Sequence, residues 1–185
     1  MRRIGIIVAM TSEYGLVKSL LEQTKDEFVH GLLFTEGRIG NVEVILAKSG
    51  IGKVCAAVGA MEMIQRYAPD VIVNTGVAGG IDPLTQVMDI VVGENMGDCR
   101  PGDDKSVRLI NHCGEGNEYG QVQGLPARFV SDKELCKLAL SVAHDGHVYG
   151  GLICSGDKFI TDKEELTEIK KRFPEGMAVD MESCA

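Results

Sequence analysis

Residues 4–9 read Ile-Gly-Ile-Ile-Val-Ala, a short apolar run rich in β-branched side chains. An uninterrupted run of this length is typical of a strand that is buried on both faces in a parallel sheet. Apolar residues at helical spacing follow between Ser12 and Gln23, so a helix is expected there. A buried strand that leads directly into a helix indicates an α/β fold.

The rest of the chain repeats this alternation of strands and helices. Further strands are expected at residues 31–36, 42–48, 71–73, 89–92, 148–154 and 177–181. A helix rich in small residues is expected over 52–67, and Ser131-x-x-Glu134 and Thr161-x-x-Glu164 fit capping boxes that predict two more helix starts. Residues 94–128 lack clear periodicity and are expected to be irregular. We therefore predict a single domain over 1–185, with a mixed central sheet flanked by helices.

Composition and charge argue against several classes of protein. The chain has 185 residues and a net charge of −8, with 44% hydrophobic residues, which is typical of a globular protein that buries a core. An acidic chain without a long basic run is not expected to bind nucleic acid or an anionic membrane. No apolar stretch approaches the roughly 18 residues that span a bilayer. The apolar run 4–10 is not followed by a secretory cleavage pattern, so a soluble, cytoplasmic protein is expected.

The cysteines and histidines do not form a recognisable metal site. The six cysteines include no Cys-x-x-Cys pair, which favours reduced thiols. His112-Cys113 and His144-x-x-His147 are the closest approaches to ligand pairs, and neither belongs to a four-ligand pattern. No metal is expected.

Two glycine-rich turns follow expected strands. In Ser49-Gly50-Ile51-Gly52-Lys53, Ala47 and Val54 occupy positions where a nucleotide-binding phosphate loop needs Gly and Ser or Thr. Gly76-Val77-Ala78-Gly79-Gly80 lacks the Gly-x-Gly-x-x-Gly spacing of dinucleotide-binding proteins. Both turns are equally compatible with plain connections and with loops whose backbone approaches a ligand.

Acidic residues also gather at expected strand ends. Glu13 follows the first strand, Asp157 follows a later one, and Asp180 and Glu182 lie at the last. The carboxyl ends of strands in an open α/β sheet converge on one crevice, so these carboxylates could share a pocket. Taken singly, each is more typical of a helix cap or a solvated acid.

Six motifs occur in order along almost the whole chain. They are Ile4-Gly5-Ile6-Ile7 with Ala9-Met10 and Glu13, Lys48-Ser49-Gly50-Ile51-Gly52-Lys53, Asn74-Thr75-Gly76-x-Ala78-Gly79-Gly80, Glu118-Tyr119-Gly120-Gln121, Ser155-Gly156-Asp157-x-Phe159-Ile160 and Ala178-Val179-Asp180-Met181-Glu182-Ser183. Together, and not singly, they resemble the 5′-methylthioadenosine/S-adenosylhomocysteine nucleosidases. The resemblance implies a nucleoside-phosphorylase-like three-layer α/β/α fold. It also implies hydrolysis of the N-glycosidic bond of adenine thioribosides, which gives adenine and a 5-thioribose derivative.

The resemblance further implies roles for individual residues. Glu13 would be the base that activates water. Glu182 would accept hydrogen bonds from the ribose 2′- and 3′-hydroxyls, Phe159 would stack on adenine, and the Ile160 backbone would bind the edge of the base. The other implied substrate-binding residues are Met10 and Ile51 in the pocket wall, Ala78 and Gly79 near the sugar and base, Met181 at the ribose, and Val179.

No cofactor is implied, because carboxylates and ribose hydrogen bonds can stabilise a transition state that resembles an oxocarbenium ion. Members of the family are homodimers in which the neighbouring subunit contributes to the 5′-thio pocket, so a homodimer is expected.

Three features depart from the family's pattern. The chain ends before the Ser-Asp pair whose Asp protonates adenine, and before the closing strand and helix. If the 185 residues were the whole molecule, we would expect leaving-group activation to fail, at a cost of about 10²–10⁴-fold in rate. Val77 stands where some members carry Ser, and residues 95–113 lack the family's usual His-Asp pair.

Three alternatives are left open. A truncated, non-catalytic nucleoside-binding protein would follow from a missing general acid, because such a loss removes rate more surely than binding. A nucleoside phosphorylase would need basic phosphate ligands near the first strand, and residues 5–13 contain neither Arg nor Lys. A hydrolase of a futalosine-type nucleoside is not distinguished by these motifs.

Overall fold

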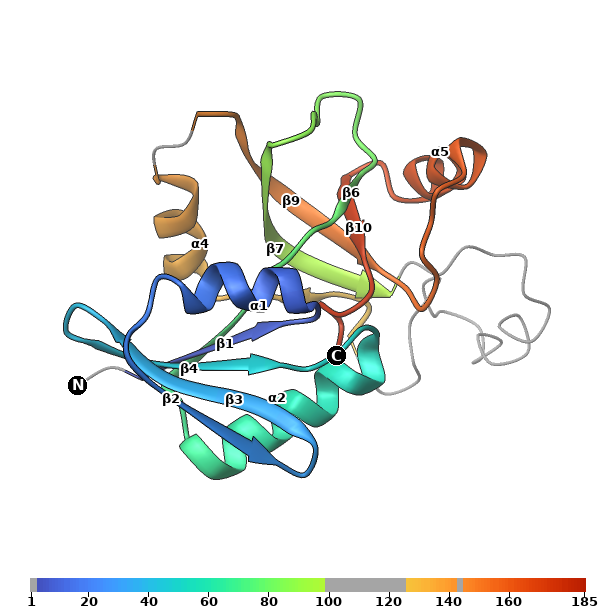
Figure 1. Ribbon diagram of the computed structural model, residues 1–185. Coiled ribbons are helices and arrows are strands. Elements are labelled where there is room, and N and C mark those ends of the chain that lie inside the picture. The colour runs from blue at the N-terminus through green and yellow to red at the C-terminus, as the bar shows by residue number, and fades with distance from the viewer. Residues whose placement is uncertain (1–2, 99–125, 143–144) are drawn as a thin grey trace. The chain divides into compact units, whose positions relative to one another are not determined.

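A computed structural model describes residues 3–98, 126–142 and 145–185 (Figure 1). The chain divides into two compact units, Met1–Val77 with Ala185 (unit 1) and Ala78–Cys184 (unit 2). The predicted α/β class with mixed sheets and flanking helices is confirmed. Where one central sheet was expected, the described strands are divided between two five-stranded sheets, one in each unit. None of the described helices is both long and apolar enough to cross a membrane.

Unit 1 combines a parallel half-sheet with an antiparallel hairpin. In spatial order its strands are β2 (Glu22–Val29), β3 (Leu32–Ile39), β4 (Val42–Lys48), β1 (Arg3–Val8) and β5 (Val71–Asn74). The strands β4, β1 and β5 are parallel, whereas β2, β3 and β4 are joined antiparallel. Helices α1 (Thr11–Lys18) and α2 (Lys53–Tyr67) lie on opposite faces of this sheet (Figure 1).

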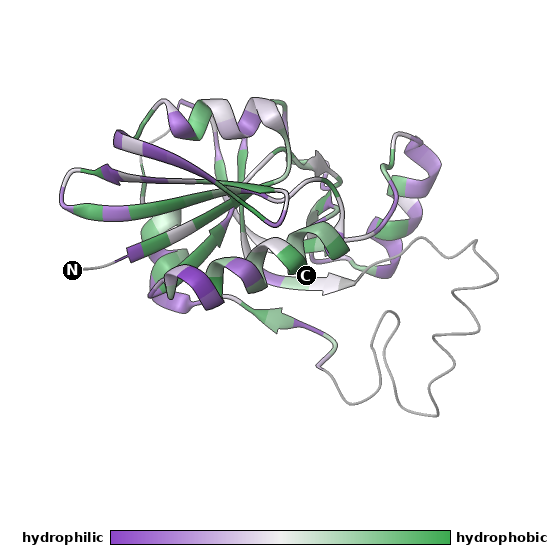
Figure 2. Cartoon of the chain, turned by 60° about the horizontal axis from the view of Figure 1, so that its bottom comes forward, coloured by the Kyte–Doolittle hydropathy of each residue, from purple (hydrophilic) through white to green (hydrophobic). Residues whose placement is uncertain are grey.

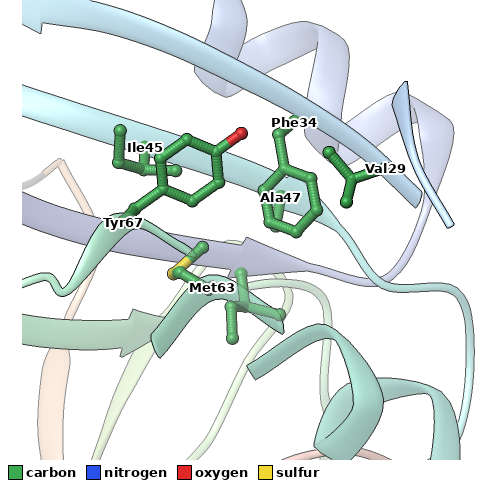
Figure 3. Close-up of a cluster of buried hydrophobic side chains, with 7 residues drawn as sticks. Val29, Phe34, Ile45, Ala47, Met63 and Tyr67 are labelled. Carbon is green, nitrogen blue, oxygen red and sulfur yellow. The ribbon is translucent and has the colours of Figure 1, made fainter. Parts of the chain in front are cut away.

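Both faces of the unit 1 sheet are buried, which accounts for the apolar runs of its central strands. The cluster on the α2 face consists of Ile7, Val29, Phe34, Ile45, Ala47, Met63 and Tyr67 (Figure 3). The cluster on the α1 face consists of Val8, Tyr14, Leu21, Val44 and Leu46. Successive residues of a strand point to opposite faces, so β4 contributes alternate side chains to the two clusters.

The helix predicted over Ser12–Gln23 is too long, because α1 ends at Lys18 and β2 begins at Glu22. The prediction missed β2, whose sequence Glu-Gln-Thr-Lys-Asp-Glu-Phe-Val is mostly charged or polar. This strand is at the edge of the sheet, and most of its residues are exposed. An edge strand tolerates charged residues and therefore shows no apolar alternation in its sequence.

Unit 2 places three parallel strands at the centre of its sheet. In spatial order the strands are β6 (Gly79–Gly80), β10 (Gly176–Asp180), β9 (Val148–Ser155), β7 (Ile90–Asp98) and β8 (Phe129–Val130). The helices are α4 (Lys133–Leu140) and α5 (Lys163–Arg172). A core of Leu152, Cys154, Ile169, Phe173 and Val179 joins α5 to β9 and β10.

The strand β7 corrects the prediction that residues 94–128 are irregular, since it continues through Asp98. Its register against β9 shifts between Gly93 and Asn95. Such a bulge breaks the two-residue alternation by which a strand is recognised in a sequence. The Glu118–Gln121 motif, His112-Cys113, His144 and residues 99–113 of the divergent stretch lie outside the described residues.

Helices α4 and α5 are capped by aspartates, so the predicted capping boxes are wrong by one residue. Asp132 Oδ1 accepts hydrogen bonds from the N–H groups of Glu134 and Leu135, at 3.0 and 2.9 Å. Asp162 caps α5 in the same way. The Ser131 hydroxyl instead donates to the Gly93 carbonyl, at 2.5 Å. A carboxylate one residue closer to the helix is an equally good cap and leaves the hydroxyl available to the sheet.

Candidate active site

The carboxyl ends of the parallel strands in unit 1 carry one group of the predicted site residues. The loops that follow β4, β1 and β5 leave the same edge of the sheet, because these strands are parallel neighbours. They carry Ile51, Met10 and Val77, respectively, and Glu13 follows Met10 in the first turn of α1. The structure thus brings the predicted residues Met10 and Glu13 to this edge, together with the turn that begins at Thr75.

Glu13 is buried, with 9% of its surface exposed, and its carboxylate is held by backbone N–H groups from two loops. Oε2 accepts from Ala9 at 3.1 Å and from Met10 at 2.8 Å, and Oε1 accepts from Val77 at 2.9 Å. Hydrogen bonds to a charged acceptor are stronger than those between neutral groups. The carboxylate therefore has a fixed position and orientation at the strand ends.

The local sequence explains how Glu13 reaches this position. Met10 precedes α1 with extended backbone, and Glu13 is the third residue of the helix. A Glu at this position reaches back to the N–H of the residue that precedes the helix, which is half of a capping box. The helix N-terminus also favours a negative charge. Glu13 thus caps the helix, which is the more ordinary role for a single carboxylate, and it also lies at the strand ends.

Gly76 permits the contact between Glu13 and the loop after β5. A Cβ atom on Gly76 would lie 2.7 Å from Glu13 Oε1 and 3.1 Å from its Cδ. Gly76 lies in one of the six motifs of the sequence, and no role was predicted for it. Its position directly after a strand parallel to β1 is the signal that could have identified it, because neighbouring strand ends must pass close to one another.

Ile51 is presented outward by the glycines on either side of it. Gly50 and Gly52 have φ values of +90° and +98°, a region that favours glycine. The Ile51 side chain is 58% exposed, and α2 begins at Lys53 directly after this turn. The exposed side chain is consistent with its predicted place in a pocket wall, and this role stays a prediction.

The carboxyl ends of β9 and β10 in unit 2 carry the second group of predicted residues. Phe159 and Ile160 follow β9, and Met181 and Glu182 follow β10. The two loops are joined, since the Gly156 N–H donates to the Asp180 carbonyl at 3.0 Å. Phe159 is 79% exposed, and its predicted contact with the base stays a prediction.

Ile160 and Glu182 are tied to their surroundings. The Ile160 side chain packs against the core of unit 2. Glu182 is half-buried, and its Oε2 accepts from the Met181 N–H at 3.3 Å. These contacts leave the loop after β10 compact and limit the positions that the Glu182 carboxylate can take.

Gly79 and Gly80 form β6, which pairs with β10 on the side away from β9, and Ala78 directly precedes it. In the antiparallel pairing of β6 with β10, Gly79 lies opposite Val179, and Gly80 lies opposite Ala178. A Cβ atom on Gly79 would lie 3.0 Å from Val179 Cγ2, so the backbone approaches β10 closely. The structure therefore groups Ala78, Gly79 and Val179 in unit 2.

The acidic residues at the strand ends differ in their surroundings. The Asp180 carboxylate accepts from both the N–H and the hydroxyl of Ser183, each at 2.9 Å, so it stabilises the turn after β10. Asp157 is exposed in the loop after β9. Asp180 thus has the ordinary turn-capping role that was weighed for a single carboxylate.

Comparisons with known proteins agree on one family. The model of the phosphorylase superfamily matches residues 3–185. A 5′-methylthioadenosine/S-adenosylhomocysteine nucleosidase of Haemophilus influenzae (strain PittEE) is 38% identical over 99% of this chain and 77% of its own length. The crystal structure of the Neisseria meningitidis nucleosidase with methylthio-immucillin-A has 36% identity and a TM-score of 0.87, and the match covers 100% of this chain and 77% of that one. The Colwellia psychrerythraea 34H nucleosidase with adenine has 33% identity and a TM-score of 0.84, over 99% of this chain and 74% of that one.

Proposed function

The chain belongs to the phosphorylase superfamily and, within it, to the 5′-methylthioadenosine/S-adenosylhomocysteine nucleosidases, and we propose on this basis that it hydrolyses the N-glycosidic bond of these two nucleosides and releases adenine. The observation that carries the proposal is the buried Glu13 carboxylate, held at the ends of β1 and β5. The family match runs through both units without a break, which supports the view that 1–185 acts as one catalytic domain.

The geometry of Glu13 suits it to take a proton from water. A carboxylate has about four lone-pair positions, two on each oxygen. Two N–H groups occupy those of Oε2, whereas among the described residues Oε1 accepts only from Val77. The second lone pair of Oε1 is therefore the one that accepts the proton as water attacks the sugar carbon that carries the base. The fixed N–H donors hold this lone pair in place during the reaction.

The nucleoside itself is assigned to the remaining predicted residues. Phe159 stacks on adenine, the Ile160 backbone binds the edge of the base, and Glu182 accepts from the ribose hydroxyls. The other substrate-binding residues of the proposal are Met10, Ile51, Ala78, Gly79, Val179 and Met181. The exposed ring of Phe159 and the close approach of Gly79 to Val179 support these assignments.

Product analysis distinguishes hydrolysis from phosphorolysis. We expect the purified full chain to release adenine from 5′-methylthioadenosine at the same rate with and without phosphate, and to give 5-methylthioribose as the sugar product. The reason is that residues 5–13 offer no Arg or Lys for a phosphate ion. Release that requires phosphate and yields the sugar 1-phosphate would show a phosphorylase instead. A folded chain that binds the nucleoside without releasing adenine would show a binding protein.

The homodimer is part of the proposal, and the surface of α2 supports it. The exposed surface of α2 carries Val54, Val58 and Met61 on the side opposite the buried Met63, and Ile64 beside them; they are 78%, 56%, 54% and 49% exposed. Figure 2 brings this side of unit 1 forward and shows hydrophobic residues along the helix. A helix that is apolar on both sides is normally buried on both, and a contiguous apolar patch marks an interaction surface.

A charge on the exposed face of α2 should separate the subunits. We expect the wild-type chain to sediment as a dimer, and Val58→Glu to shift it toward the monomer by raising the dissociation constant at least about 10-fold, because the glutamate would lose its water at the interface. Leu138→Glu on α4 is the control, since Leu138 is 63% exposed on another helix. A wild-type monomer, or a Val58→Glu dimer as tight as the control, would contradict the proposal.

A further inference from the structure

We propose that a chain of hydrogen bonds from Tyr14 through Thr35 and Asp26 to Lys18 positions the Glu13 carboxylate for the reaction. This inference rests on the proposed function, because it concerns the residue that activates water there. The four residues come from α1, β3 and β2, and the path of hydrogen bonds both begins and ends on α1. They are positioning residues, since their effect on the substrate acts through Glu13.

The direction of each hydrogen bond in the chain follows from the chemistry of the groups. The Thr35 hydroxyl donates to Asp26 Oδ1 at 2.6 Å, because a carboxylate only accepts. A hydroxyl has one hydrogen, so Tyr14 must be the donor in its bond to Thr35 Oγ1. Lys18 Nζ then donates to both oxygens of Asp26, at 2.8 and 2.5 Å. Along the path of hydrogen bonds from Tyr14 through Thr35 to Asp26, each hydroxyl thus has a single possible acceptor.

The inner members of the network are shielded from water. Tyr14 is 5% exposed and Thr35 is fully buried, whereas Lys18 and Asp26 are partly exposed. The hydrogen bonds from Lys18 and then Thr35 hold the pKa of Asp26 below its ordinary value, so the carboxylate is charged at neutral pH. Asp26 and Thr35 are also direct partners in the β2–β3 ladder, which fixes their separation. Breaking an inner bond would leave a buried hydroxyl without a partner.

Helix α1 needs such an anchor because it is short and mostly exposed. It has eight residues, of which only Glu13 and Tyr14 are buried. A helix of this length is not stable by itself, so its tertiary contacts decide its position. Tyr14 follows Glu13 directly, and its ring packs in the cluster with Val8 and Leu46. A shift of the Tyr14 side chain therefore moves the backbone that carries the Glu13 carboxylate.

The opposite face of the same strand offers a matched control. Glu27 follows Asp26 in β2 and faces α2, where its carboxylate accepts from Arg66 and from the Tyr67 hydroxyl, the latter at 3.0 Å. Tyr67 is 7% exposed, much as Tyr14 is. Tyr14→Phe and Tyr67→Phe thus remove the same atom from similarly buried positions; the first breaks the bond to Thr35 in β3, which leads on to Asp26 in β2, and the second breaks the bond to Glu27 in β2. Only Tyr14 is connected to Glu13.

The experiment compares these two variants by turnover and by amide hydrogen exchange. We expect Tyr14→Phe to lower kcat about 10-fold with little change in KM, because a displaced base slows the chemical step more than substrate binding. We also expect exchange of the Met10 and Val77 N–H groups, which bind Glu13, to become about 10-fold faster. Tyr67→Phe should leave kcat and both exchange rates within about twofold of wild type, even if it lowers Tm equally.

Substitutions of Thr35 supply a second test. Thr35→Ser keeps the hydroxyl and should keep wild-type kcat and exchange, whereas the similarly shaped Thr35→Val should behave like Tyr14→Phe. Equal effects of Tyr14→Phe and Tyr67→Phe on kcat and exchange would overturn the inference. The exchange measurement needs no substrate. A wild-type chain without nucleosidase activity would therefore contradict the proposed function, while the exchange rates would still decide whether the network positions Glu13.

Discussion

Glu13→Gln is expected to lower kcat for adenine release by about 10²–10⁴-fold, the usual contribution of a positioned acid or base. The amide cannot take a proton from water at neutral pH. Its oxygen is expected to stay with the Ala9 and Met10 N–H groups, because they are two donors to one atom. Its NH₂ group then faces the Val77 N–H, which loses its acceptor. The measurement is steady-state turnover of 5′-methylthioadenosine by the purified variant.

The loss of rate must be separated from a loss of folding. An unpaired N–H group in this site costs about 1–3 kcal/mol of stability, so kcat is measured well below the Tm of the variant. Glu22→Gln is the control, because Glu22 is an exposed carboxylate at the start of β2 and should leave kcat unchanged. Full turnover by folded Glu13→Gln, with unchanged substrate affinity, would show that Glu13 is not the base.

Gly76→Ala is expected to lower kcat about 100-fold without touching a catalytic group directly. The added methyl group would lie 2.7 Å from Glu13 Oε1, closer than real Cβ contacts allow. The backbone at Gly76 does not have a positive φ, so the effect comes from this contact and not from backbone strain. Either the carboxylate or the loop after β5 must move, and a displacement of about 1 Å at a reacting group has effects of this size.

The control for Gly76→Ala is Gly15→Ala, the same substitution two residues after Glu13. A Cβ on Gly15 would meet no atom within 4 Å. This variant should keep wild-type kcat and gain about 0.5–1 kcal/mol of stability, since Ala is the better helix former. Gly76→Ala with wild-type kcat would mean that the position of Glu13 Oε1 does not limit the reaction.

Most of the fold could be predicted because its central strands are buried on both sides. The strands β1, β4 and β9, which lie inside their sheets, are marked by apolar runs, and the structure confirms them. The apolar run of β5 also marks a strand, although β5 lies at the edge of the described sheet and is partly exposed. The sequence signal fails where a strand is mostly exposed or the ladder is irregular. Exposure hides β2, and the bulge at Gly93 hides the second half of β7. Neither property can be read from a single sequence, because both depend on which strand lies alongside.

The site residues that could be predicted are those that the order of parallel strands places at one edge of a sheet. Glu13 could be placed at the end of β1 because parallel strands present their carboxyl ends at one edge. The Val77 N–H and the Thr35 hydroxyl could not be predicted, although they lie within unit 1. Val77 is 64 residues from Glu13, and Thr35 is 21 residues from Tyr14. These contacts follow from the register of β3 and the path of the loop after β5, which no local pattern encodes.

We propose that Glu13 Oε1 activates the water that attacks the sugar. A crystal structure of the full chain with methylthio-immucillin-A, the ligand of the Neisseria complex, tests this role. We predict an ordered water about 2.6–3.2 Å from Glu13 Oε1, below the sugar-ring atom that carries the base. In the same map, the adenine-like ring of the ligand should stack on Phe159, and its sugar hydroxyls should donate hydrogen bonds to Glu182. A ligand bound elsewhere, or a water held by groups other than Glu13, would contradict this assignment.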